Sequence, residues 1–227
     1  MKIMTFNTQH CLNYITRKID FEVMAKAITE YDADIVGLNE MRGLGTSEEY
    51  REQVEILARL TGMKYFYFGK AIDTSEGPYG NGFLSKIPIK SVKTVLIPNA
   101  EPDKYETRGI IIAELENGVT VYVTHVGLTP MEAENAVAAL CEHVILKKSV
   151  LMGDFNMTPE DKILAPIFER MTDTAEGFCA EKLSFPSVDP NRKIDFIFVS
   201  RDLKVTFADI PAIVASDHRP HIAWVEF

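Results

Sequence analysis

Five polar sites in this sequence each lie beside an apolar run, and their residue types are those that bind hard metal ions or transfer protons. They are Asn7, Glu40, His125, the stretch 153–156 (GDFN) and the stretch 216–218 (SDH). The ends of strands hold such side chains rigidly, while the adjoining loops expose them. The pattern therefore predicts a single site along one edge of a sheet.

The GDFN stretch follows the apolar run 150–152. Gly and Asp both favour turns, so Gly153 and Asp154 alone are as consistent with an ordinary turn as with function. Asn156 adds an amide two residues after Asp154. We expect Asp154 to orient a water molecule or bind a metal ion, and the Asn156 amide to hold a phosphate oxygen.

The SDH stretch places His218 directly after Asp217 and ahead of a predicted strand. Histidine has a pKa suited to proton transfer near neutrality, and Asp217 can bind a cation from the same turn. Asp195, at the mouth of another predicted strand, would fix the tautomer of a neighbouring His218 and stabilise its charged form. Taken alone, Asp195 is better explained as a strand-end cap or as the partner of Lys193.

Glu40 ends an apolar strand, where a buried carboxylate is costly unless it has a partner. Mg²⁺ or Mn²⁺ is one natural partner, because these ions prefer a few carboxylate oxygens together with water and substrate oxygens. Asn7, at a neighbouring strand end, is expected to complete the metal's surroundings or to contact a substrate oxygen. Its alternative interpretation is a loop cap.

Two further residues suit anion binding. Asn81 lies in the glycine-rich stretch 79–82 (YGNG), where backbone can approach a ligand, although the same composition is typical of a turn. Arg108 begins a strand, and its guanidinium suits bidentate pairing with a phosphate. Structural pairing of Arg108 with Glu40 or Glu106 is the alternative.

The elements that must position these residues are predicted from apolar periodicity. The expected strands are 2–6, 34–38, 64–68, 81–85, 91–97, 109–115, 119–124, 149–152, 194–199, 203–208 and 221–226. The expected helices are 21–31, 48–61, 130–147 and one beginning at Thr158-Pro159. Asn117-Gly118 predicts a hairpin, so part of the fold is antiparallel. Many short strands with a few helices favour an α/β fold of two sheets packed face to face, with helices outside.

Composition limits the class of protein. The 227 residues are 46% apolar and contain no linker or repeat, which predicts one domain over residues 1–227 with a sizeable core. The net charge of −9 argues against a broad electrostatic grip on nucleic acid, although it leaves room for a local basic strip. The three cysteines, widely spaced and without a CxxC motif, indicate reduced thiols.

No run of about 18 apolar residues suggests a membrane span, and the N-terminus does not resemble a signal peptide. We therefore expect a cytoplasmic protein, and no protein partner is indicated.

The ordered motifs TFN, LNE, YGN, ETRG, THV, GDFN, KIDFIF and SDHRP resemble the endonuclease/exonuclease/phosphatase superfamily from residue 5 to residue 220. The resemblance implies a four-layer α-β-β-α sandwich, like that of deoxyribonuclease I, with one Mg²⁺-dependent site at the open edge of two mixed sheets. By motif position it implies metal binding by Glu40 with Asn7, and by Asp217 at the metal or behind it. It implies a catalytic His218 paired with Asp195. Asp154 and Asn156 would place water and a phosphate oxygen, and His125 would stabilise the developing charge.

The resemblance leaves the base open between Asp154 and His218. Two departures, Gln9 and His125, separate the sequence from abasic-site repair enzymes, which have an acid and a tyrosine at these positions. The expected substrate is a phosphate ester, first a phosphodiester in a nucleic acid or small molecule, and second a sugar or inositol phosphate. Segments 42–50 and 70–79 are the expected substrate-facing loops.

Two other classes fit less well. A non-catalytic binding module on the same fold should have lost Glu40, Asp154 or His218, and all three are present. A dinuclear calcineurin-type phosphoesterase needs more histidine ligands than the five histidines here supply at suitable spacing.

Overall fold

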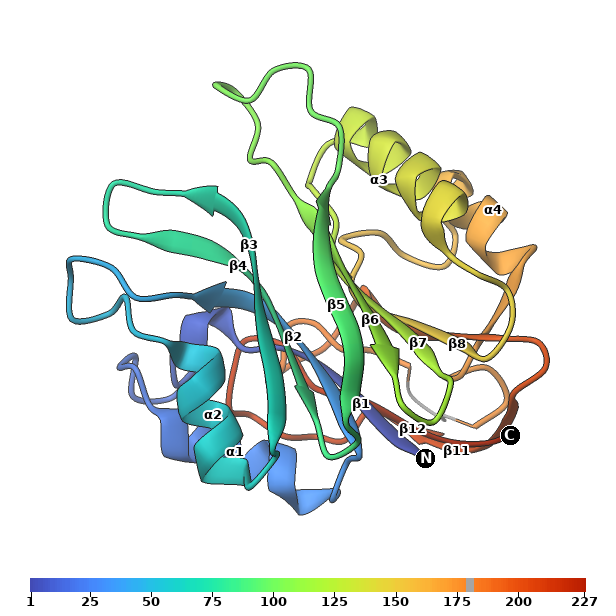
Figure 1. Cartoon of the computed structure of the whole chain (residues 1–227), viewed down its shortest axis with the longest axis horizontal. Coiled ribbons are helices and arrows are strands. Elements are labelled where there is room, and N and C mark those ends of the chain that lie inside the picture. The colour runs from blue at the N-terminus through green and yellow to red at the C-terminus, as the bar shows by residue number, and fades with distance from the viewer. Residues whose placement is uncertain (179–181) are drawn as a thin grey trace.

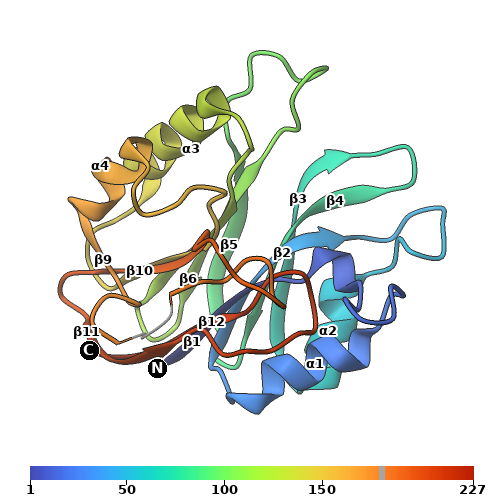
Figure 2. The same cartoon turned by 180° about the vertical axis from the view of Figure 1, so that it is seen from behind.

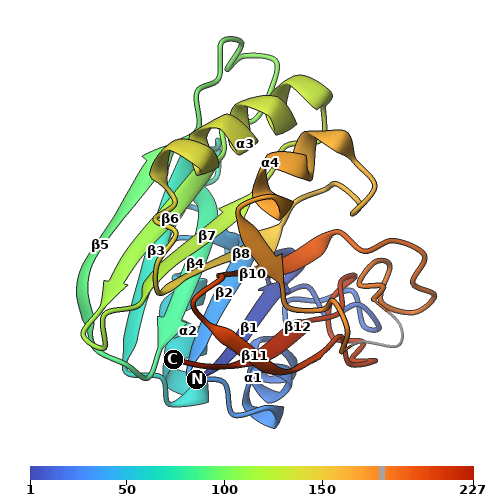
Figure 3. The same cartoon turned by 90° about the vertical axis from the view of Figure 1, so that its right-hand side faces the viewer.

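The computed structural model describes residues 1–178 and 182–227. It contains two six-stranded sheets packed face to face, with helices on both outer faces (Figure 1). The four layers lie in the order helices, sheet, sheet, helices across Figure 1, and the view turned by 90° in Figure 3 shows the strands of the two sheets overlapping. The predicted α/β sandwich of two mixed sheets is therefore confirmed.

The first sheet has the strand order β11-β12-β1-β2-β4-β3. Its strands are β1 (Lys2–Asn7), β2 (Ile35–Arg42), β3 (Tyr65–Asp73), β4 (Pro78–Ser85), β11 (Lys204–Asp209) and β12 (His221–Glu226). Among the described residues of this sheet, β1 and β2 form the one parallel pair, and the other strand pairs are antiparallel. The two ends of the chain meet here, because the amino group of Met1 donates to the carbonyl of Val225 at 2.7 Å.

The second sheet has the order β5-β6-β7-β8-β10-β9. Its strands are β5 (Ile89–Leu96), β6 (Gly109–Leu115), β7 (Thr120–His125), β8 (Ser149–Asp154), β9 (Met171–Asp173) and β10 (Asp195–Ser200). Strands β6 and β7 form the hairpin predicted from Asn117-Gly118, and β7 pairs in parallel with β8. Figure 2 shows β9 and β10 from behind.

Alternating side chains of the strands build three apolar layers. Ile3 and Ile35 of the first sheet pack against Val123 and Met152 of the second in the layer between the sheets. Gly37 allows this approach, because a Cβ there would lie only 3.0 Å from the sulfur of Met152. The other two layers lie under the helices on each side, so the sheets form a rigid frame for residues at their edges.

The helices cover the outer faces of the sheets. They are α1 (Phe21–Glu30) and α2 (Gln53–Thr61) on the first sheet, and α3 (Pro130–His143) and α4 (Ala165–Phe168) on the second, with 3-10 turns at Gln9–Cys11 and Lys162–Leu164. Helix α3 begins at Pro130, as expected. Thr129 accepts from the backbone N–H of Glu132, and the Glu132 carboxylate accepts from that of Thr129. Among the described residues, no helix is long and apolar enough to cross a membrane.

Several predicted elements were wrong in detail. Thr158-Pro159 does not begin a helix, because the Asp161 carboxylate accepts from the backbone of Thr158 and closes a turn. Helix α2 begins at Gln53 rather than at residue 48, and α3 ends at His143, which leaves Ile145 56% exposed. The three-residue strand β9 was missed, because it is too short for a periodic signal.

Cys11 and Cys141 are free thiols, whereas Cys179 lies outside the described residues.

Strand register brings the polar strand ends together. The parallel pair β1–β2 aligns Asn7 with Asn39, and the parallel pair β7–β8 aligns His125 with Asp154. The antiparallel pair β8–β10 then places Asp195 beside Asp154. These residues therefore lie at one edge shared by the two sheets.

Candidate active site

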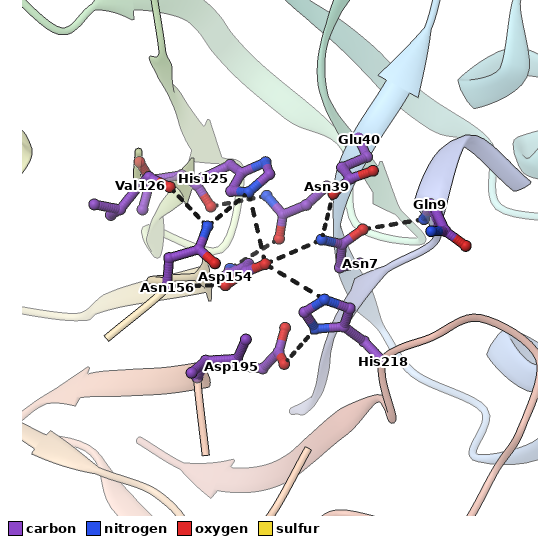
Figure 4. A network of polar contacts seen from close by, with 12 residues as sticks. Asn7, Gln9, Asn39, Glu40, His125, Val126, Asp154, Asn156, Asp195 and His218 are labelled. Atoms are coloured by element: carbon purple, nitrogen blue, oxygen red, sulfur yellow. Dashed lines mark hydrogen bonds and ion pairs between the residues drawn. The ribbon is translucent and has the colours of Figure 1, made fainter. Parts of the chain in front are cut away.

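Asp154 lies at the centre of a polar network at this edge (Figure 4). Its Oδ2 accepts from Nδ2 of Asn7 at 3.0 Å and lies 3.6 Å from Nε2 of His125 and 3.7 Å from Nε2 of His218. Its Oδ1 accepts from the backbone N–H of Asn156 at 2.9 Å. Asp154 as a residue is 1% exposed, so two imidazoles and an amide surround its carboxylate instead of bulk water.

Gly153 explains how Asp154 reaches this position. Its φ of +146° is one that side chains rarely adopt, and a Cβ would collide with the carbonyl of Thr124 on the neighbouring strand β7. Only glycine therefore lets the end of β8 approach β7 so closely. The glycine of the GDFN motif is therefore required to position Asp154 in the site, and it does more than form an ordinary turn.

His218 is held from the opposite side by Asp195. Its Nδ1 lies 2.8 Å from Oδ2 of Asp195, which is fully buried at the start of β10, and its ring packs against Phe185 with ring centres 4.7 Å apart. Burial alone would lower the pKa of His218, but the carboxylates of Asp195 and Asp154 outweigh it and raise this pKa to about 10. The geometry therefore favours an imidazolium.

The pKa of the neighbouring Asp154 carboxyl group is also raised, which makes this group a better base. Burial, and then the negative charge of Asp195, raise the pKa of Asp154 to about 7, although the charge of His218 and the hydrogen bonds from Asn156 and Asn7 oppose the rise. A carboxylate with such a pKa is a stronger base than an exposed aspartate and still ionises near neutrality. The pair thus combines a fixed cation with a buried base.

His125 lies on the far side of Asp154 from His218. Its Nδ1 faces a guanidinium N–H of Arg108 at 2.9 Å, and its Nε2 faces Nδ2 of Asn156 at 3.1 Å. Burial, followed by the charges of Arg108 and His218, lowers the pKa of His125 well below its usual value. The two histidines therefore differ in charge, because carboxylates surround one and cations face the other.

Glu40 projects from a bulge in β2. The register with β4 shifts between Leu38 and Met41, and Glu40 itself has a φ of +61°. A bulge re-aims side chains at a sheet edge, and here Oε1 of Glu40 accepts from Nδ2 of Asn7 at 3.1 Å. Burial raises the pKa of Glu40, and the negative charge of Asp217 adds to the rise, which the hydrogen bond from Asn7 opposes.

The sequence as a whole matches the model of the endonuclease/exonuclease/phosphatase family over residues 4–218. The chain belongs to this family. No curated protein sequence matches it significantly. Family membership confirms the resemblance carried by the motifs and makes the protein a hydrolase of phosphate esters in the broad sense.

Solved structures of the family share the fold. An endonuclease/exonuclease/phosphatase from Beutenbergia cavernae matches with a TM-score of 0.80 at 20% identity, covering 100% of this chain and 71% of that one. A mannosyl-6-phosphatase from Bacteroides thetaiotaomicron gives 0.78 at 16% identity, with 100% of both chains covered. A 3′ phosphatase from Neisseria, bound to a product DNA hairpin, gives 0.70 at 19% identity, also with 100% of both chains covered.

The residues around Glu40 fit the divalent metal ion that the family generally uses. The carboxylates of Glu40 and Asp217 supply the charged oxygens that Mg²⁺ and Mn²⁺ prefer. The amide of Asn7 lies beside them: its Nδ2 faces Oε1 of Glu40, and its Oδ1 accepts from the backbone N–H of Gln9 at 3.0 Å. Ligand atoms of Asp154, Asp195 and His218 also lie within 4.8 Å of one another. In that second group His218 is already bonded to Asp195, which suits proton transfer better than metal binding.

Sequence reasoning missed Asn39. Its fully buried amide donates to Oδ1 of Asn81 at 2.9 Å and to the carbonyl of Thr124 at 2.8 Å, and its Oδ1 accepts from the backbone N–H of Asp154 at 2.9 Å. Asn39 therefore joins the two sheets directly beneath the candidate active site. The sequence signal that could have identified Asn39 is an amide residue within an apolar strand, next to Glu40.

The remaining candidates occupy different positions. Asn81, 3% exposed, accepts from Asn39 and donates to the carbonyl of Gly109 at 3.2 Å, so both ends of its amide have protein partners. Arg108 lies behind His125 and pairs with Glu106 at 2.8 Å. Asp217 is half-buried and accepts from the hydroxyl of Ser216 at 3.0 Å. Phosphate binding by Asn81 and Arg108, and metal binding by Asp217, stay predictions.

Proposed function

We propose that this protein hydrolyses phosphodiesters in a divalent-metal-dependent reaction, by in-line attack of water on phosphorus. The observation that carries the proposal is the position of Asp154, whose Oδ2 lies 3.6 Å from Nε2 of His125 and 3.7 Å from Nε2 of His218. The pKa of His125 is lowered and that of His218 is raised, so the first histidine is neutral where the second is protonated. This spacing leaves a carboxylate beside two nitrogen atoms that can face phosphoryl oxygens.

Asp154 is the proposed base. It orients the attacking water and accepts its proton, because its raised pKa suits proton transfer near neutrality. His218, held by Asp195 at 2.8 Å, stays protonated and cannot accept that proton. The choice left open by the sequence thus falls on Asp154, and His218 stabilises the negative charge that develops on the phosphoryl group.

His125 and Asn156 are the proposed ligands of a non-bridging phosphate oxygen. Both are held by the frame: His125 by Arg108, and Asn156 through donation from Nδ2 to the carbonyl of Val126 at 2.9 Å. Donors fixed in this way require little reorganisation as charge develops, so their effect is greatest in the transition state.

Glu40, Asn7 and Asp217 are the residues that would hold the metal ion. When bound, Mg²⁺ or Mn²⁺ supplies positive charge that polarises the phosphoryl group. Asn7 donates to both Glu40 and Asp154, so one amide ties the metal-holding carboxylate to the proposed base.

Phosphomonoester hydrolysis is the second candidate. The guanidinium of Arg108 beside His125 adds positive charge, which suits the dianion of a monoester, and the net charge of −9 does not favour long nucleic acids. Proteins of the same fold include one described as a mannosyl-6-phosphatase and one as a 3′ phosphatase bound to a DNA hairpin. A nucleic acid therefore remains among the substrates to be tested, beside sugar phosphates.

The two candidates separate in one comparison. Hydrolysis of bis-p-nitrophenyl phosphate and of p-nitrophenyl phosphate is measured with Mg²⁺, Mn²⁺ or EDTA. The proposal expects faster turnover of the diester, abolished by EDTA. Preference for the monoester would replace it by the second candidate, and a panel of supercoiled plasmid, single-stranded RNA and sugar phosphates then identifies the substrate class.

A further inference from the structure

The ring of His125 has a hydrogen-bond donor at each nitrogen. A guanidinium N–H of Arg108 lies 2.9 Å from Nδ1, and Nδ2 of Asn156 lies 3.1 Å from Nε2. An uncharged imidazole has one nitrogen that accepts and one that carries a proton, so it can satisfy only one of two donors. The surroundings of His125 therefore select one tautomer.

The orientation of Asn156 does not relieve this conflict. Its Nδ2 also donates to the carbonyl of Val126 at 2.9 Å, and a flipped amide would set two oxygens against each other there. Arg108 is the stronger donor of the two, because its guanidinium is always charged and has no acceptor atom. Nδ1 must therefore accept from Arg108, and the proton must lie on Nε2.

Arg108 is itself held in place. It pairs with the carboxylate of Glu106 at 2.8 Å and lies beside the phenol of Tyr79, and its side chain is only 14% exposed. It directly precedes Gly109 at the start of β6, in the hairpin register that pairs Ile110 with Thr124 of β7. The strand pairing thus delivers the guanidinium to the end of β7, where His125 lies.

We propose that Arg108 is a positioning residue that fixes His125 in the Nε2–H tautomer, so that His125 donates to the phosphoryl oxygen and cannot accept a proton there. In this tautomer the N–H faces the side of the ring on which Oδ2 of Asp154 lies, at 3.6 Å. The role of the donor in turnover rests on the proposed function; the tautomer itself does not.

The tautomer is measured directly by long-range ¹H–¹⁵N NMR on histidine-labelled protein. The five histidines keep the spectrum small, and His125→Asn assigns the signal. In the wild type we expect an unprotonated Nδ1 and a protonated Nε2 on His125. In Arg108→Met we expect this preference to be lost. Arg42→Met is the matched control, because Arg42 is similarly exposed (15%) and also pairs with an acid, Glu49, yet it has no contact with His125 among the described residues.

Kinetics separate positioning from direct phosphate binding. Arg108→Met should lower kcat about 10- to 100-fold with little change in KM, the size of effect typical of residues that orient a ligand from behind. A proton on Nδ1 in the wild type would overturn the proposal, and that result needs no variant. An unchanged tautomer in folded Arg108→Met, with a raised KM, would also overturn it and make Arg108 a phosphate ligand. If the wild type shows the expected tautomer but hydrolyses no phosphate ester, the proposed function fails and the tautomer assignment stands.

Discussion

Replacing Asp195 by Asn tests the coupling between His218 and Asp154. The substitution keeps the size of a fully buried side chain but removes the charge that lies 2.8 Å from Nδ1 of His218. A charge-assisted hydrogen bond contributes about 1.5–3 kcal/mol, which corresponds to roughly a 10- to 150-fold loss if the imidazolium acts in the transition state. We expect kcat to fall by a factor in this range.

The same substitution should move the pH profile in a defined direction. The charge of Asp195 is, after burial, the main cause of the raised pKa of Asp154. Provided that the carboxylate of Asp154 still keeps His218 protonated, removal of that charge lowers the pKa of Asp154, so its carboxylate stays ionised to lower pH. The acidic limb of kcat/KM against pH should therefore shift below its wild-type midpoint, although the maximal rate is lower.

Asp173→Asn is the matched control, since Asp173 is also a buried acid of the second sheet. It pairs with the buried Lys193 at 2.9 Å and is expected to affect stability instead of the pH profile, because its loss leaves a buried ammonium without its carboxylate. Rates and acidic limbs are measured with a model diester, and folding is checked by thermal melting. A folded Asp195→Asn enzyme with wild-type kcat and an unshifted acidic limb would refute the assigned roles of this pair.

Three further predictions concern the frame and the metal. Gly153→Ala should destabilise the protein by about 2 kcal/mol or more, because the new Cβ meets the Thr124 carbonyl. Gly118→Ala, at φ +83° with open space around it, should cost only about 1 kcal/mol. Equal losses of unfolding free energy in denaturant would contradict this difference. Burial, and then Lys193, lower the pKa of His221 to about 4. In the unfolded state His221 binds its proton near the ordinary pKa, so the free energy of unfolding is highest above about pH 6.5 and falls by up to about 3 kcal/mol towards pH 4. The free energy of unfolding of His221→Asn should lack this fall. The same pH dependence in the variant and the wild type would argue against the assigned pKa of His221. Mn²⁺ at about 100 times its Kd should stabilise the wild type by about 2.7 kcal/mol in thermal melts. Glu40→Gln should lose this shift and the control Glu49→Gln should retain it, so an equal shift in both would place the ion elsewhere.

The strand-end pattern was sufficient to predict the fold class and to gather the candidate residues, because parallel and antiparallel registers bring strand ends to a common edge. His125 and Asp154 meet because β7 and β8 pair in parallel. The hairpin at Asn117-Gly118 also contains the register that brings Arg108 to His125, although the contact was not foreseen from it.

Other features of the site depend on tertiary context that no local signal carries. The bulge that turns Glu40 outward requires a φ of +61° at a glutamate, which sequence propensities oppose. Asn39 gains its role only when the two sheets pack, because its partners, Asn81, Thr124 and Asp154, come from β4, β7 and β8. The turn at Thr158 likewise resembled a helix start until Asp161 supplied a competing hydrogen bond.

The most direct test is the turnover of a model phosphodiester by the wild type and by Asp154→Asn, each with Mn²⁺ and with EDTA. If Asp154 is the base beside the metal-binding residues, the substitution should lower kcat by roughly 10²- to 10⁴-fold while thermal melting shows a folded protein, and EDTA should abolish wild-type turnover. Near-normal turnover by folded Asp154→Asn, or turnover that survives EDTA, would contradict the proposed mechanism.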